Sequence, residues 1–469
     1  MKNDRLLYRY FGVILFASNF ILGFMIWLQG SRAGLFCAPR PGMDQHTMLE
    51  AALNMARDGI LPIPGKYLYS PAYTIFLAVT AKLTGNSLPV MRLLQLAVSS
   101  LIPWMIYRTA VFGGFGRRAA ALSGVMWLFC GSALLISLDF LRAAPLALCF
   151  ISLLYFLLRG LRCRNGLPRA AAAGLLAGLC ILGRENFIPV VCVPAVFWFI
   201  PAAKYRDGYA RLAVYAFCAF LIMLPVLAYN FCHTSSIAVL PGNGKNVFEF
   251  MQGQDSLASP VRATAGVIRR MPGTVYAMIS PFENPNSLSV YAHREAIPLL
   301  KLLCLPITWL FALCVPALRS RSRAIFLTVL LIGTYFATLI FCEIYYRFRI
   351  PVLPLLCVAG GAGVMQIVCL VRERARSTFF FLLPAAASLW LTAATVPERM
   401  IPRSEREATV RFLLDRHRFT QAGDLLLRYR ECGVASPQGE RLLIVMLLKN
   451  DRRADAVYWH GAFSSGGGK

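Results

Sequence analysis

Acidic side chains beside apolar segments are the first candidates for chemistry in this chain, which has only 22 Asp and Glu among 469 residues. Asp44 follows the first apolar segment, and Asp139 lies at the end of the third, three residues before Arg142. A carboxylate in such a place can serve as a general base. The plain alternatives are helix capping by Asp44 and an ion pair between Asp139 and Arg142.

Arginines at the ends of apolar segments form the second group of candidates. Arg347 and Arg349 follow Tyr345 and Tyr346 directly before an apolar segment, and Arg184 closes an earlier one. Guanidinium groups there could bind a phosphate, or they could extend toward lipid headgroups. The tyrosines could stack on a sugar ring or anchor the chain at the membrane interface.

Three further residues are weaker candidates. His46 could assist proton transfer or bind a metal, but one His without neighbouring ligands favours an ordinary loop residue, so we expect no metal and no cofactor. Asn243 and Asn246 lie among glycines in segment 240–246, where their amides could contact hydroxyl groups. A plain turn is the alternative for that segment.

The composition requires a membrane around these residues. Hydrophobic residues make up 58% of the chain and charged residues 15%, and apolar runs of about 20 residues recur, the length that spans a bilayer. The formal net charge of +26 does not indicate nucleic-acid binding, because the basic residues form short clusters between apolar runs. We therefore predict an all-α, polytopic membrane helix bundle in contact with membrane lipid.

The basic clusters set the predicted topology, since Lys and Arg in short loops stay on the cytoplasmic side. Placing six clusters inside gives about 11 spans, near residues 11–29, 88–110, 119–137, 143–159, 170–185, 187–203, 212–230, 298–317, 324–343, 351–371 and 377–396. The N-terminus is then cytoplasmic and the C-terminus extracytoplasmic. The chain is predicted to be a multi-pass protein of the inner or plasma membrane.

One apolar segment, residues 71–84, is too short to be counted as a span. We expect it to lie at the membrane surface, which leaves extracytoplasmic loops near 30–87 and 231–297. Residues 1–396 then form a transmembrane domain, and the polar residues 397–469 form a small helical tail.

Most of the 14 cysteines lie inside apolar runs and are interpreted as small core residues. Four fall near or beyond the outer interface, so a pair among them could be oxidised: Cys37, Cys232, Cys342 and Cys432. The sequence leaves the pairing open.

The order of these motifs resembles a known family over about residues 10–360. An acidic residue soon after the first span, the outer aromatic-Pro-aromatic segment 67–73, and segments 182–186 and 345–354 are similar to those of the protein O-mannosyltransferase superfamily. These are GT-C glycosyltransferases, which include the bacterial lipid A aminoarabinose transferases.

The resemblance implies transfer of a hexose or pentose from a polyprenyl-phosphate-linked donor to a glycan, lipid or protein acceptor on the extracytoplasmic face, usually with inversion. Asp44 matches the position of the family's catalytic acid, and Arg347, Arg349 and Arg184 suit the donor phosphate. Residues expected to contact substrate are Tyr345, Tyr346, Asp139, Asn243, Asn246 and His46.

Two departures from the family pattern place Asp139 below Asp44 as a candidate. Ser70-Pro71 stands where many relatives have two prolines before the aromatic residue. In the family a second functional acid often precedes a Pro-Leu pair, whereas here Asp139 lies several residues before Pro145-Leu146. A transporter is one alternative, but it predicts an inverted repeat and polar groups at the bilayer midplane. An O-antigen polymerase or ligase is another, and those enzymes usually carry their largest loop late in the chain.

Overall fold

The computed structural model describes residues 2–33, 35–36, 39, 44–59, 70–162, 166–193, 207–234, 271–276, 278–280, 290–340, 346–373, 403–415, 419–432, 442 and 445. The predicted span 377–396, most of the predicted loop 231–297 and the end of the predicted span 187–203 lie outside these residues.

Every regular element in the described part is a helix. The α-helices are α1 (Lys2–Arg32), α2 (Asp44–Asp58), α3 (Pro71–Thr84), α4 (Leu88–Ser99), α5 (Leu101–Gly113), α6 (Arg117–Leu128), α7 (Gly131–Ser137), α8 (Ala143–Arg162), α9 (Leu167–Gly183), α11 (Asp207–Thr234), α14 (Val290–Ala296), α15 (Pro298–Leu302), α16 (Ile307–Ala317), α17 (Arg323–Leu339), α18 (Tyr346–Arg349), α19 (Leu353–Arg372), α22 (Arg403–Asp415) and α23 (Phe419–Glu431). The prediction of an all-α membrane bundle is therefore confirmed.

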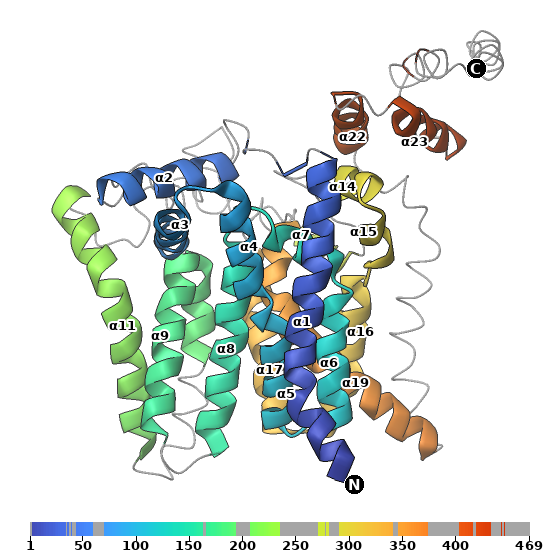
Figure 1. Ribbon diagram of the computed structural model, residues 1–469. Coiled ribbons are helices and arrows are strands. Elements are labelled where there is room, and N and C mark those ends of the chain that lie inside the picture. The colour runs from blue at the N-terminus through green and yellow to red at the C-terminus, as the bar shows by residue number, and fades with distance from the viewer. Residues whose placement is uncertain are drawn as a thin grey trace.

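The long helices stand side by side as a bundle (Figure 1). Five described segments are long and apolar enough to cross a membrane, namely Tyr10–Arg32, Leu88–Gly113, Ala143–Gly160, Gly208–His233 and Arg347–Arg372. Three shorter apolar helices run beside them, from α9, α16 and α17. The central parts of the corresponding predicted spans coincide with these helices. The predicted total of about 11 spans includes segments outside the described residues and stays a prediction.

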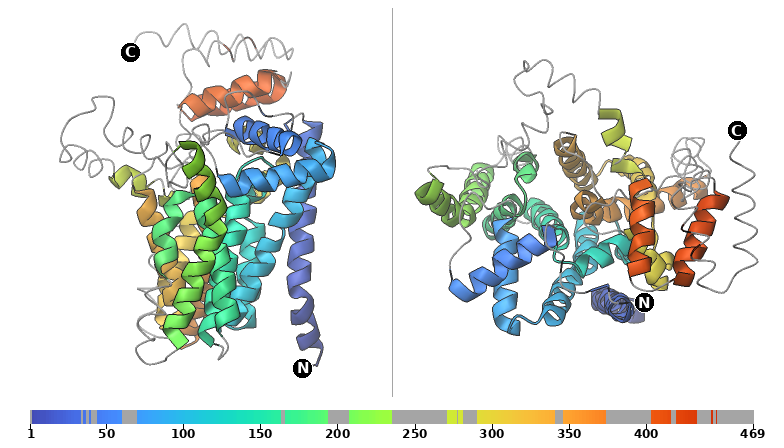
Figure 2. Two further views of the ribbon diagram at one scale, coloured as in Figure 1. Left: turned by 90° about the vertical axis from the view of Figure 1, so that its left-hand side faces the viewer. Right: turned by 90° about the horizontal axis from the view of Figure 1, so that it is seen from above.

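Helices α2 and α3 do not run with the bundle but lie across one end of it (Figures 1 and 2). The sequence sets the limits of α3 locally. Ser70 caps its start by accepting a hydrogen bond from the Tyr73 N–H at 3.3 Å, and Pro71 occupies the first turn. Gly85, with φ of 61°, ends it in the left-handed conformation. The helix thus spans the interval 71–84 that was expected at the membrane surface.

Two predicted spans are interrupted. Segment 119–137 is divided into α6 and α7, and segment 298–317 into α15 and α16. The breaks face each other, because the Gly131 N–H donates to the Leu303 carbonyl at 2.9 Å and the Leu305 N–H to the Phe129 carbonyl at 3.0 Å. Hydropathy alone did not reveal these breaks, since Lys301 is the one charged residue in the two segments and both stay apolar on average.

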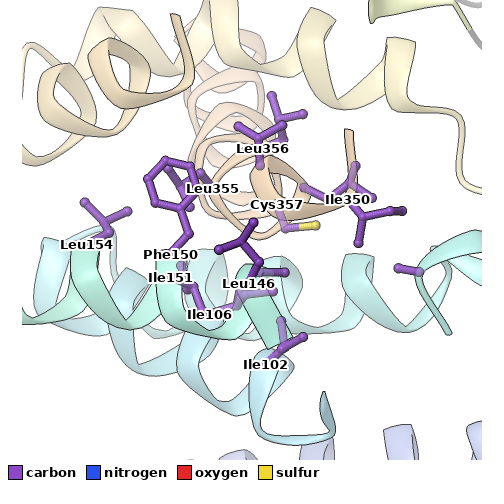
Figure 3. Packing of buried hydrophobic residues seen from close by; sticks show 14 of the residues in the cluster. Ile102, Ile106, Leu146, Phe150, Ile151, Leu154, Ile350, Leu355, Leu356 and Cys357 are labelled. Atoms are coloured by element: carbon purple, nitrogen blue, oxygen red, sulfur yellow. The ribbon is translucent and has the colours of Figure 1, made fainter. Parts of the chain in front are cut away.

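The core lies where α5, α8 and α19 meet. Figure 3 shows Ile102 and Ile106 of α5, Phe150 of α8 and Leu355 of α19 among its interleaved side chains. Close approach of α19 to α6 requires glycine at 361, since a Cβ there would lie 2.5 Å from the Ala119 carbonyl oxygen. This packing fixes the start of α19, and with it α18, against α8.

The helix ends that carry the described members of the basic clusters lie at the bundle end where α1 begins (Figure 1). Arg211, at the start of α11, donates to the Gly160 carbonyl near the end of α8 at 3.2 Å. Arg319, after α16, lies 3.7 Å from Glu373, after α19. Helices α2 and α3 lie at the opposite end, so the cationic end and the end carrying Asp44 are separated by the length of the bundle.

The C-terminal helices α22 and α23 lie beyond the same end as α2 and α3 (Figure 2). They form a pair with its own small core of Val410, Leu413, Ala422, Leu425, Leu426 and Tyr429. Arg428 forms an ion pair at 2.9 Å with Glu295 of α14, which connects this pair to the bundle.

Candidate active site

Helix α2 holds Asp44 over the end of the bundle. It is amphipathic, and its apolar face buries Met48, Leu49 and Ala52 in a cluster with Tyr73 and Leu77 of α3. Because α3 itself packs on α4 and α9, the first residue of α2 has a fixed place above the helix ends. That residue is Asp44.

Asp44 forms an ion pair with Arg347 of α18, 303 positions later in the chain. The side chain of Asp44 is 24% exposed and that of Arg347 is 14% exposed, so the pair is shielded but reachable from solvent. The structure thus brings together the predicted acid and one of the predicted phosphate-binding arginines.

Arg142 and Arg184 complete a cationic pocket around this pair. The pocket has about 330 Å³ of empty space and is lined by Asp44, Met48, Leu141, Arg142, Ala143, Leu146, Arg184, Arg347, Phe348 and Pro351. The guanidinium of Arg184 stacks on the Phe348 ring, with its central carbon 3.7 Å from the ring centroid. Three guanidinium groups around one carboxylate leave a net positive charge, which suits an anionic ligand.

Arg142 is the member of this pocket whose role the sequence did not predict. Its Nη1 donates to the Gly183 carbonyl at 3.3 Å. Burial, together with the charges of Arg184 and Arg347, lowers the pKa of Arg142 to about 9. The group therefore remains largely cationic at neutral pH, and a bound anion would stabilise that charge. The sequence does carry a signal for this role, because Arg142 directly precedes the apolar helix α8, just as Arg184 directly follows α9.

Arg349 does not join this pocket. It is 4% exposed, donates to the Ser280 carbonyl at 2.7 Å, and lines a second cavity of about 460 Å³ together with Arg294. The reason is geometric, because residues two positions apart on a helix point to different sides. The predicted pair of Arg347 and Arg349 therefore faces two cavities, and Arg347 is the one that forms the ion pair with Asp44.

Asp139 lies in a buried polar network rather than in the pocket. Its carboxylate accepts hydrogen bonds from Gln45 Nε2 at 2.8 Å and from the Phe140 N–H at 3.0 Å. The expected ion pair with Arg142 is not the observed arrangement, since Arg142 faces Gly183 and the cation influencing Asp139 most is Arg92. Gln45 directly follows Asp44, so the Asp139 contact helps to fix the start of α2.

We expect the variant Asp139→Asn to gain thermal stability relative to wild type as the pH rises. Burial raises the pKa of Asp139, while the Gln45 hydrogen bond and the charge of Arg92 oppose this. The protonated carboxyl group therefore stabilises the folded state. This contribution is complete below the pKa of the unfolded state and is lost as the pH rises through the higher pKa of the folded state. An asparagine at position 139 does not titrate, so it does not lose this contribution. Gln45 can rotate its amide so that Oε1, which has no hydrogen-bond partner in the described part of the protein, accepts from the new Asn side chain.

Thermal unfolding in detergent between about pH 4 and about pH 8 measures this difference. The matched control is Asp58→Asn, because Asp58 is exposed and its hydrogen bond with Arg57 lowers its pKa. Parallel melting profiles for wild type and Asp139→Asn over this pH range would contradict the assignment.

The remaining candidates are placed as follows. His46 lies on the first turn of α2, where its Nδ1 is 3.6 Å from a carboxylate oxygen of Glu50, one turn further along the same helix. Tyr346 begins α18, but its side chain is outside the described set, as are Tyr345, Asn243 and Asn246 entirely. Within the described ranges, no three His, Cys, Asp or Glu side chains gather in a way that could hold a metal ion.

Residues 69–229 match the family model described as dolichyl-phosphate-mannose-protein mannosyltransferase. This region runs from the start of α3 almost to the end of α11 and includes Asp139, Arg142 and Arg184. No curated protein matches the chain in sequence.

Solved structures share the fold at low sequence identity. The oligosaccharyltransferase of Archaeoglobus fulgidus in the apo form is similar with a TM-score of 0.51 and 12% identity, over 92% of this chain and 60% of that chain. The archaeal oligosaccharyltransferase AglB from the same organism, in complex with an inhibitory peptide and a dolichol-phosphate, gives 0.50 and 13%, over 93% and 60%. This chain therefore spans less than two thirds of those proteins. ArnT from Cupriavidus metallidurans bound to undecaprenyl phosphate gives 0.49 and 16%, over 89% and 73%.

Proposed function

We propose that this chain is a GT-C-type glycosyltransferase that transfers a sugar from a polyprenyl-phosphate-linked donor to an acceptor at the extracytoplasmic face of a membrane, which the family-model match over residues 69–229 and the shared fold support. The observation that carries the proposal is the ion pair between Asp44 and Arg347 inside a pocket that also holds Arg142 and Arg184. The pocket combines a base with a set of cations, and glycosyl transfer from a lipid phosphate requires both.

The orientation follows from the charges. Lys and Arg next to spans remain cytoplasmic. The described basic clusters lie at the bundle end opposite α2 and α3. The Asp44 pocket then faces the extracytoplasmic side, as does the pair α22 and α23. Such a placement gives the pocket access to lipid-linked donors at the membrane surface.

In the proposed reaction the acceptor hydroxyl attacks the anomeric carbon of the donor sugar. Asp44 accepts the hydroxyl proton as the new carbon–oxygen bond forms. The bond between the anomeric carbon and the phosphate oxygen breaks, and the electron pair leaves with the polyprenyl phosphate. Arg347, Arg184 and Arg142 stabilise the charge that develops on this leaving group. Attack opposite the leaving group inverts the anomeric carbon.

Arg347 has two roles in this scheme. Without substrate its guanidinium forms an ion pair with Asp44, and this neutralises the negative charge of a carboxylate that is largely shielded from solvent. When a phosphate enters the pocket, the guanidinium can share its donors between the phosphate and Asp44, because it carries five N–H groups. The ion pair therefore keeps the base close to the position of the leaving group.

The test is a transfer assay with the purified full-length protein and synthetic polyprenyl-phosphate sugars. Hexose and pentose donors are offered separately, with glycan, lipid and peptide acceptors. Product that depends on the lipid-linked donor supports the proposal. Uptake of a solute into proteoliposomes without any sugar transfer would favour a transporter instead, and polymer formation from lipid-linked oligosaccharides would favour a polymerase or ligase.

A further inference from the structure

A pair of cysteines faces each other where two predicted spans are interrupted. Cys130 lies between α6 and α7, Cys304 lies between α15 and α16, and the two residues form an isolated antiparallel bridge. The flanking hydrogen bonds are made by residues 129, 131, 303 and 305. Cys130 and Cys304 are thus a non-hydrogen-bonded pair, whose Cα atoms typically lie about 4.5 Å apart. Disulfides require a Cα separation of about 4.4–6.8 Å.

Both residues also line the same cavity, the one of about 460 Å³ that contains Arg294 and Arg349. Cys304 is exposed, whereas Cys130 is 3% exposed. Both thiols are free in this structure, and the Cys130 thiol donates to the Met126 carbonyl at 3.5 Å. Cys304 is therefore the more accessible member of the pair. The cavity adjoins Ile350 and Leu353, next to the outer start of α19, so the pair lies near the membrane boundary.

We propose that Cys130 and Cys304 form a disulfide bond that connects the α6–α7 junction to the α15–α16 junction. The proposal depends on the orientation given above, because disulfides persist on the extracytoplasmic side and are rare in the cytosol. It does not depend on the sugar-transfer chemistry. From the sequence, both residues are expected to be core cysteines, and the cysteines expected to be candidates for oxidation are Cys37, Cys232, Cys342 and Cys432. Of those four, Cys37 and Cys342 lie outside the described residues.

The bond would form by thiol–disulfide exchange with an oxidised dithiol protein or a small disulfide. The Cys304 thiolate attacks one sulfur of the oxidant's disulfide, and the other oxidant sulfur leaves as a thiol. The Cys130 thiolate then attacks the Cys304 sulfur of this mixed disulfide and releases the second oxidant thiol. Two cysteine thiols are oxidised, the oxidant takes up two electrons, and the two thiol protons end on the oxidant's sulfurs.

Cys357 of α19 is the competing partner, because its thiol contacts that of Cys130. Cys357 is fully buried, however, so an oxidant can reach the Cys130–Cys357 pair only through Cys130. Exchange depends on access of the attacking thiolate. The exposed Cys304 is therefore the expected site of first attack, and it directs the bond to Cys130.

Peptide mapping without reduction tests this proposal on the wild-type protein. Membranes are dissolved in sodium dodecyl sulfate with excess N-ethylmaleimide, digested and analysed by mass spectrometry. We expect a linked peptide pair containing Cys130 and Cys304 in most molecules, converted to two free peptides by reduction. Recovery of both residues as N-ethylmaleimide adducts, or a link from Cys130 to Cys357, would overturn the assignment.

A second measurement follows the consequence for stability. Reduction, or the variant Cys304→Ser, should lower the Tm of the detergent-solubilised protein by several degrees, because the bond constrains the unfolded chain. The matched control is Cys314→Ser, since Cys314 lies within α16 and its thiol donates to the Leu310 carbonyl at 3.2 Å. That variant should keep the linked pair and its sensitivity to reduction. Sugar transfer is measured on the same samples, so loss of the disulfide and loss of the proposed function are told apart.

Discussion

The variant Asp44→Asn is expected to lose sugar transfer, with kcat reduced by about 10²–10⁴-fold, the contribution typical of a positioned general base. Asn has nearly the same shape but cannot accept the hydroxyl proton. It also leaves Arg347 in place with Arg142 and Arg184, so binding of the lipid-linked donor should remain close to wild type. The measurements are the rate of product formation at saturating donor and, separately, the donor Kd.

The control for this variant lies on the same helix. Asp58 ends α2, is exposed and pairs with its neighbour Arg57 at 2.8 Å, so Asp58→Asn removes one carboxylate of α2 without touching the pocket. We expect it to keep full activity. Wild-type turnover by Asp44→Asn would exclude Asp44 as the base and with it the mechanism proposed above.

The variant Arg347→Ala should weaken donor binding by about 10- to 100-fold, the effect of losing a hydrogen bond to a charged group worth about 1.5–3 kcal/mol. Removal of the guanidinium also leaves the Asp44 carboxylate in a shielded site without its ion-pair partner. Arg347→Lys should restore only part of the affinity, because an ammonium group cannot contact a phosphate and Asp44 in the same planar geometry. Titration with a fluorescent polyprenyl phosphate measures the Kd directly.

Arg349→Ala is the informative comparison, because Arg349 is two residues away but lines the other cavity. The sequence predicts equal effects for the two arginines, whereas the structure predicts a much smaller change in donor affinity for Arg349→Ala. An equal loss of affinity in both variants would mean that the donor phosphate does not occupy the Asp44 pocket alone.

The ion pair also predicts coupling between the two largest effects. In the double variant Asp44→Asn/Arg347→Ala, the loss in kcat/KM should be smaller than the sum of the two single losses in free energy, since the residues are in contact. Additive losses would indicate that Asp44 and Arg347 act in separate steps.

The sequence by itself determined the all-α membrane bundle and the approximate positions of the spans that lie within the described residues. These depend on short-range rules, because a bilayer requires about 20 apolar residues for each helix and retains Lys and Arg on one side. Helix α3 is equally local, with Ser70, Pro71 and Gly85 setting its limits. Asp44 could be selected because a carboxylate just after a span is rare in such a composition.

Only the tertiary structure decided which of these side chains meet. The contacts between Asp44 and Arg347 and between Gln45 and Asp139 join residues 303 and 94 positions apart. The directions of Arg347 and Arg349, the place of Arg142 in the pocket and the facing of Cys130 and Cys304 likewise follow from how α18 and the interrupted helices pack. Hydropathy and charge fix how far each segment enters the membrane, whereas rotation about a helix axis and the partner of each side chain are set by packing against other helices.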